Sequence, residues 1–291
     1  MSTTLEQLRR LRRDAGVADT TPVLAPPPAA PLRPRSEVPE HIRRLLGIRA
    51  KATAPRLAAP VPVVATDRRM PGVAIADGLY YSEHHQPWPD VPERVDARFA
   101  RLDLLAREHL VFFDTETTGL AGGTGTRAFM IGAADWHAGG LRLRQLTMAT
   151  MAAETAMLGL FASWLSPQSV LVSYNGKCYD APLLNTRYRL ARLASPLPGL
   201  VHLDLLHPSR RRWKGRWENC RLGTLERQVL GIVREDDLPG AEAPRAWLDY
   251  LRGGCARNLR RVAEHNAQDL RSLAALCLHH ARLSDGAMLG P

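Results

Sequence analysis

The feature that most constrains the fold of this chain is an apolar run that ends in two acids, Leu110-Val111-Phe112-Phe113-Asp114-Thr115-Glu116. A short run of this kind is typical of a central strand that is buried on both faces. Residues two apart on a strand point to the same side, so both carboxylates should project together from its end. Neighbouring carboxylates repel one another unless a cation neutralises them, and hard divalent metals prefer oxygen ligands. The run therefore favours a buried sheet with a metal site at a strand end.

The residues after about 104 predict an α/β fold with a mixed five-stranded sheet flanked by helices. Besides the strand at 110–113, strands are expected at 129–131, 141–144, 170–174 and 200–203. The turn His137-Ala138-Gly139-Gly140 joins the second and third strands into an antiparallel hairpin. Apolar residues at helical spacing predict helices near 157–165 and 183–188, and a last helix at about 258–278.

Two further motifs add carboxylates to the first pair. Asn175-Gly176-Lys177-Cys178-Tyr179-Asp180 follows the fourth strand and places Asp180 at a strand-to-helix junction. His265-Asn266-Ala267-Gln268-Asp269 falls in the last helix, where residues four apart share a face. The three motifs together present four carboxylates: Asp114, Glu116, Asp180 and Asp269.

The three motifs, taken in order, resemble those of the DEDD superfamily of ribonuclease-H-like 3′-5′ exonucleases. Within it the chain looks most like the YprB-type family, and the segments 121–126, 203–208 and 247–252 also fit that family. The resemblance covers roughly residues 70 to 280. It implies a ribonuclease-H-like fold in which the four acids hold two Mg²⁺ or Mn²⁺ ions about 4 Å apart, which activate a water and stabilise the charge on the phosphate.

The resemblance implies a 3′-5′ exonuclease that acts on single strands of DNA or RNA. Two alternatives stay open at this point. One is a structure-specific endonuclease, because the same metal chemistry can cut internally. The other is a non-catalytic module that only binds nucleic acid.

The last motif departs from both known patterns of the superfamily. One branch has a histidine five residues before the final aspartate, and the other has a tyrosine four residues before it. Here His265 stands four residues before Asp269. His265 is a candidate catalytic residue that orients or deprotonates the attacking water. The alternative is a structural histidine on the helix surface.

Three other features of the sequence also need an interpretation. Gly122-Gly123-Thr124-Gly125-Thr126 lacks the Lys-Ser/Thr ending of a phosphate loop, so we expect a tight loop beside the metal site. Asp204 ends the fifth strand and either supports the metal site or caps the next helix. The acidic loop that contains Asp236, Asp237 and Glu242 is interpreted as structural.

The balance of charge suits a polyanionic partner, and nucleic acid is the first candidate. The formal net charge is +10, although an arginine-rich composition can also reflect genomic bias. The densest basic stretch is interleaved with Trp213 and Trp217. We expect the two tryptophans to pack and the basic side chains to contact nucleic acid. These basic residues are Arg210, Arg211, Arg212, Lys214 and Arg216.

The chain divides into three regions by composition. Residues 1–70 are basic and rich in proline and alanine, which predicts a mostly disordered arm that either holds nucleic acid or is a solvated tail. Residues 71–105 are expected to connect the arm to the domain and to pack on it. Residues 106–282 form the predicted nuclease domain.

The remaining composition points to the cytoplasm. Four cysteines without a C-x-x-C pair indicate a reduced chain rather than a disulfide framework or a zinc site. The N-terminus lacks the apolar core of a signal peptide, and no stretch is long and apolar enough to span a membrane. No membrane partner is therefore expected.

Overall fold

A computed structural model describes residues 66–119, 124–235 and 237–286, all of which lie within one compact unit, 64–291. Most of the predicted basic arm lies outside the described residues. The first described residues already contact the rest of this unit, because Asp67 forms an ion pair of 2.6 Å with Arg260 and Met70 is buried. None of the helices in these ranges has the length and apolar character that crossing a bilayer requires.

A mixed seven-stranded sheet with the strand order β1-β2-β7-β6-β5-β8-β9 forms the centre of this unit. The five predicted strands are all present as β5 to β9, with β8 parallel to β5 and to β9 and with β6 and β7 in the predicted hairpin. Ala138 and Gly139 both have positive φ in its two-residue turn, as a tight hairpin requires. The strands are β1 (Val73–Ala76), β2 (Leu79–Pro87), β5 (Leu110–Thr117), β6 (Ala128–His137), β7 (Gly140–Met148), β8 (Val170–Ser173) and β9 (Val201–Asp204).

Two strands beyond the predicted five correct the strand count. β2 pairs with β7 along its whole length, and β1 adds an edge to β2. The sequence of β2, Leu-Tyr-Tyr-Ser-Glu-His-His-Gln-Pro, buries only Leu79 fully, so no apolar alternation marks it as a strand. The same region, 71–105, also forms a separate two-stranded sheet from β3 (Arg94–Asp96) and β4 (Leu104–Ala106).

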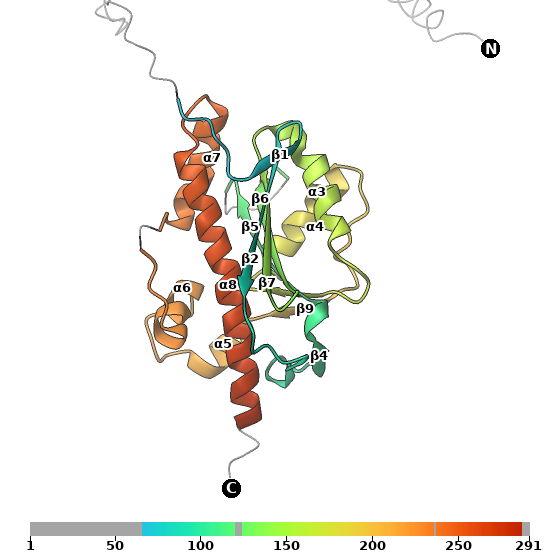
Figure 1. Cartoon of the computed structure of the whole chain (residues 1–291), viewed down its shortest axis with the longest axis vertical. Helices are drawn as coiled ribbons and strands as arrows, with labels where there is room; N and C mark the ends of the chain where they lie inside the picture. The colour runs from blue at the N-terminus through green and yellow to red at the C-terminus, as the bar shows by residue number, and fades with distance from the viewer. Residues whose placement is uncertain (1–65, 120–123, 236, 287–291) are drawn as a thin grey trace, which may run out of the picture. The chain divides into compact units, whose positions relative to one another are not determined.

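Helices cover both faces of the main sheet (Figure 1), with α8 along one face and α3 and α4 on the other. β5 alternates between the two cores as predicted, because Phe113 packs in one hydrophobic cluster and Phe112 in the other. The helices are α3 (Glu154–Ser163), α4 (Asp180–Leu190), α5 (Leu206–Trp213), α6 (Leu222–Leu225), α7 (Ala243–Leu251) and α8 (Arg257–Gly286), with a π-helical turn η4 (Glu226–Leu230) and short 3-10 turns η1 (Arg98–Ala100), η2 (Arg107–His109), η3 (Met151–Ala153) and η5 (Gly240–Glu242).

A glycine on β6 allows α8 to lie close to the sheet. A Cβ atom on Gly132 would lie 2.0 Å from Oδ1 of Asn266 and 2.9 Å from Cδ1 of Leu270. Only a residue without a side chain fits at that point. The close approach places the middle of α8, which carries Asp269, against the strand that carries Asp114.

Candidate active site

Three elements bring the four predicted acids together. Asp114 and Glu116 lie at the end of β5, Asp180 begins α4, and Asp269 lies in the middle of α8. The hydroxyl of Thr115 donates a hydrogen bond to Oδ1 of Asp180, which ties β5 to α4. The charges of Asp180 and Asp269 both act on Asp114 and on Glu116, so the four carboxyls form one electrostatic cluster.

Burial raises the pKa of every acid in this cluster, and the charges of neighbouring acids add to the rise for Asp114 and Glu116. Burial, then the charges of Asp269, Asp180 and Glu116, raises the pKa of Asp114 well above its usual value. Burial, then the charges of Asp269 and Asp180, raises the pKa of Glu116 to about 8. Burial raises the pKa of Asp180 to about 6. Burial also raises the pKa of Asp269 above its usual value. Such a set of oxygen atoms is expected to take up a cation when the acids ionise.

A buried amide holds Asp114 in place. Asn266, which is fully buried, donates from Nδ2 to Oδ2 of Asp114 at 2.9 Å. Its own Oδ1 accepts a hydrogen bond of 2.9 Å from Gln145 on β7. Asn266 belongs to the predicted His-Asn-x-x-Asp motif, and this contact gives the asparagine of the motif a physical role.

Asp204 fixes the loop that leads to Asp180. Its Oδ1 accepts from the backbone N–H of Asn175 at 2.7 Å, and its Oδ2 accepts from that of Lys177 at 3.1 Å. Oδ1 also accepts from the N–H of Leu206 at 3.0 Å, at the start of α5. Both interpretations left open therefore have support, because Asp204 accepts from the first N–H of α5 and also acts on Asp180 through the loop and through its charge.

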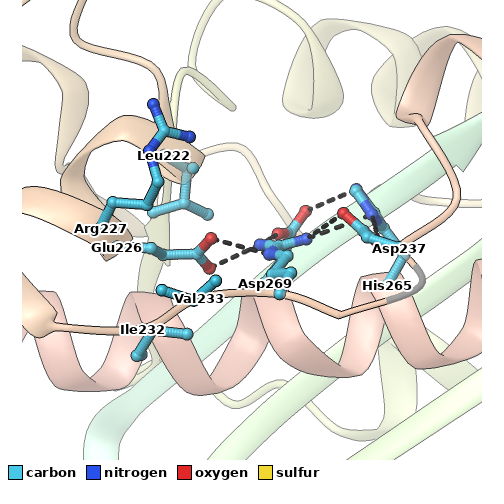
Figure 2. Close-up of a pocket in the computed structure, with 10 residues that line it drawn as sticks. Leu222, Glu226, Arg227, Ile232, Val233, Asp237, His265 and Asp269 are labelled. Atoms are coloured by element: carbon cyan, nitrogen blue, oxygen red, sulfur yellow. Dashed lines mark hydrogen bonds and ion pairs between the residues drawn. The ribbon is translucent and has the colours of Figure 1, made fainter.

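Arg234 enters the acid cluster from the loop after η4, and no sequence motif indicated this contact. Its Nη2 donates to Oδ1 of Asp269 and to Oε1 of Glu226, the latter at 2.5 Å, and its Nε donates to Oε2 of Glu226 at 2.7 Å. Figure 2 shows Glu226 and Asp269 on either side of these contacts. The loop brings a cation from about 35 residues upstream of Asp269, which no local pattern could reveal.

His265 lies beside Asp269, as the four-residue spacing predicts. Its Nε2 is 3.5 Å from Oδ2 of Asp269, and its Nδ1 is 2.7 Å from Oδ1 of Asp237 and 3.2 Å from Nη1 of Arg234. Figure 2 shows Asp237, His265 and Asp269 close together. The interpretation of the acidic loop as merely structural is therefore wrong for Asp237, whose charge also raises the pKa of Glu116.

Two pockets are lined in part by the acids. One, of about 390 Å³, is lined by Asp269 and His265 and by an apolar wall of Leu222, Ile232 and Val233. The other, of about 400 Å³, is lined by residues that include Asp114, Asp180 and the exposed ring of Tyr179. The acids thus contribute to the lining of two cavities.

No three His, Cys, Asp or Glu side chains in the described ranges are placed so that they could already hold a metal ion. Two of the acids have protein partners. Arg234 engages Oδ1 of Asp269, and Asn266 engages Oδ2 of Asp114. The donor set itself, four clustered carboxyls, still has the chemistry that Mg²⁺ and Mn²⁺ prefer.

A family model described as the RNase_H superfamily matches residues 111–280, which is more than half of the chain. The chain belongs to the RNase_H superfamily. It is 38% identical over 177 residues to the protein YprB of Bacillus subtilis, a match that covers 60% of this chain and 43% of YprB. This match confirms the predicted resemblance to YprB-type proteins, although the chain spans less than half of that relative's length.

Two solved structures match this chain at low sequence identity. The family B DNA polymerase of Pyrobaculum calidifontis has a TM-score of 0.44 and 14% identity, over 57% of this chain and 24% of the polymerase. A complex of E. coli exonuclease I with single-stranded DNA has a TM-score of 0.36 and 16% identity, over 53% of this chain and 42% of exonuclease I.

The predicted basic stretch lies on α5 and just after it. Trp213 is buried and Trp217 is half-buried in the core on the α8 side of the sheet, which confirms that the two tryptophans pack. Arg212 and Arg216 line a cavity of about 470 Å³ with these rings. Contact of the basic side chains with nucleic acid stays a prediction, and all of them are exposed: Arg210, Arg211, Arg212, Lys214 and Arg216.

The described part of the glycine-rich loop lies beside the second pocket. Residues 120–123 are outside the described ranges, but Gly119 and Thr126 line that pocket. Arg187 on α4 donates from Nη1 to the carbonyl of Thr124 at 2.8 Å and pairs with the buried Glu154. The helix that carries Asp180 therefore also positions this loop.

Proposed function

We propose that this protein is a metal-dependent nuclease that hydrolyses phosphodiester bonds of nucleic acid at Asp114, Glu116, Asp180 and Asp269. The observation that supports this most directly is the cluster itself. Four carboxyls from three elements lie at two pockets, and charges within the set raise the pKa of Asp114 and of Glu116. A fold gains nothing in stability from such repulsion, so the cluster points to a bound cation and to function.

Each acid has a place in the proposed chemistry. Asp114, Glu116, Asp180 and Asp269 would hold Mg²⁺ or Mn²⁺, which when bound supplies a Lewis acid for the phosphate and lowers the pKa of a bound water. Asn266 keeps Asp114 oriented, and Thr115 does the same for Asp180. His265, oriented by Asp237 at its Nδ1, presents Nε2 toward Asp269 and would take or direct the proton of the attacking water.

We infer 3′-5′ exonucleolytic cleavage of single strands as the activity, on the support of the three DEDD-type motifs. A structure-specific endonuclease would use the same acids. Linear and circular single strands of DNA and of RNA, end-labelled or body-labelled, separate the two with Mg²⁺, Mn²⁺ or a chelator present. The proposal expects stepwise loss of mononucleotides from the 3′ end of linear strands and intact circles. Cleaved circles would instead establish the endonuclease.

The contact between Arg234 and Asp269 favours a second candidate, a module that binds nucleic acid without cutting it, because a protein cation already satisfies one of the acids. The same panel of substrates decides between the two. Retarded migration of labelled strands, with no product in Mg²⁺ or Mn²⁺ at any time point, would support the binding module and reject the nuclease.

A further inference from the structure

Arg234 is held in place by a buried acid that is not part of the metal cluster. The side chain of Glu226 is 1% exposed and takes two hydrogen bonds from Arg234 and a third from the hydroxyl of Ser272 on α8. Gly231, with φ of +67°, turns the chain after η4 so that Arg234 points back over α8. Two donors to one carboxylate fix a guanidinium in a defined plane.

The same guanidinium neutralises Asp269. Its Nη2 is shared between Glu226 and Asp269, while its Nη1 lies 3.3 Å from Oδ2 of Asp237. The side chain of Asp269 is only 16% exposed, so water gives its negative charge little stabilisation. Arg234 thus engages one oxygen of a carboxylate that is proposed to hold the metal ion.

A metal ion and a guanidinium compete at that carboxylate, because both are cations and repel one another at short distance. We propose that Arg234 is a built-in counter-cation of Asp269 that a divalent metal must displace, so that Arg234 sets the metal affinity of the site. This inference rests on the proposed metal site. Glu226 retains the guanidinium after displacement, which keeps the positive charge beside the cluster.

Calorimetric titration with Mn²⁺ alone, without nucleic acid, tests the competition directly. Arg234→Gln removes the competing charge, so it should tighten Mn²⁺ binding by about tenfold, within the usual range for coupling between two binding events. Arg227→Gln is the matched control, because Arg227 lines the same pocket but pairs with the exposed Glu218 at 2.8 Å. The control should bind Mn²⁺ as the wild type does.

A second variant is needed because Arg234→Gln leaves the buried Glu226 without its arginine partner. The double variant Glu226→Gln with Arg234→Gln removes both members of the buried pair, so no unpaired carboxylate is left at position 226. It should keep most of the gain in Mn²⁺ affinity. A gain in the single variant that disappears in the double variant would mean that Glu226 had become a ligand, and would overturn the competition.

Melting curves in chelator and in Mn²⁺ add a readout that a merely structural arginine would not produce. Both Arg234 variants should melt lower than the wild type in chelator and gain more from Mn²⁺. Equal or weaker Mn²⁺ binding by both variants would overturn this inference and leave the nuclease proposal intact. Wild-type protein that binds no Mn²⁺, or binds it equally well after Asp180→Asn, would instead reject the metal site itself.

Discussion

At the scale of single residues, the site depends on which neighbour each polar atom meets. His265 has a carboxylate at either ring nitrogen, with Asp237 2.7 Å from Nδ1 and Asp269 3.5 Å from Nε2. A carboxylate at Nδ1 holds an imidazole in one orientation and leaves the other nitrogen for proton transfer. The sequence predicted that His265 and Asp269 share a face, and the loop that contributes Asp237 completes the arrangement.

Replacing His265 should lower the rate without removing the metal. We predict that His265→Ala reduces the single-turnover rate by about 10²–10⁴-fold, because a positioned acid-base group is lost, while Mn²⁺ affinity changes little. His265→Tyr restores the tyrosine of one superfamily branch at its own spacing and should recover part of the rate. His84→Ala, on the exposed part of β2, is the control. A less stable His265→Ala protein with a full rate would make the histidine structural.

The raised pKa of Glu116 predicts how stability depends on pH when metal is absent. Its pKa is about 8 in the folded protein and its ordinary value is 4.5, so the folded state binds more protons between these values. Stability in chelator should therefore fall as pH rises from about 4.5 to about 8. Glu116→Gln should flatten this fall and raise the melting temperature at pH 8 by roughly 3 °C or more. Identical pH profiles for the two proteins would contradict the assigned repulsion.

At the scale of elements, the distance between α8 and the sheet determines whether the acids meet. Gly132 on β6 leaves room for Asn266, and Asn266 in turn reaches Asp114. The sequence predicted the helix and the strand but not this approach, because a glycine inside a strand shows only that something comes close. The loop 231–239 was equally hidden, since the contacts of Arg234 and Asp237 span about 30 residues.

Adding one methyl group at Gly132 tests this arrangement. We predict that Gly132→Ala lowers stability by about 1–3 kcal/mol, because the new Cβ would overlap Asn266 and push α8 outward. The displaced acids should lower the cleavage rate by about 10²-fold. Gly159→Ala is the matched control, because a Cβ on Gly159 of α3 meets nothing within 4 Å. Chemical denaturation and single-turnover assays on both variants measure the two effects; similar behaviour of both would remove the role of the close approach.

At the scale of the whole molecule, the parts predicted correctly are those with a local signal. β5 is buried on both faces and its apolar run shows it, and the motifs place in order the three elements that carry the acids. β2 was missed because its Tyr, Ser, Glu and His residues lie on a largely solvated strand, whose place depends on pairing with β7. The pairing of β2 with β7 and the contact of Arg234 with Asp269 both depend on residues far apart in the sequence. A local sequence pattern does not predict such contacts.

The N-terminal arm is predicted either to hold nucleic acid through its basic residues or to be a solvated tail. Deleting residues 1–65 leaves Asp67 and Arg68, which contact Arg260 and the carbonyl of Tyr250. If the arm holds nucleic acid, the truncated protein should bind labelled single strands more weakly and with a smaller dependence on salt. The rate at saturating substrate should change little. Binding measured at several salt concentrations gives the slope, and an unchanged slope would make the arm a passive tail.

The most direct test of the central claim is the cleavage rate of a labelled single strand at saturating Mn²⁺ for the wild type, Asp180→Asn and Asp103→Asn. Asp103 is an exposed acid outside the cluster, so its variant matches the change in charge. The four-carboxyl site predicts that Asp180→Asn loses essentially all activity and that Asp103→Asn keeps it. Cleavage by Asp180→Asn at the wild-type rate would contradict the assignment of the active site.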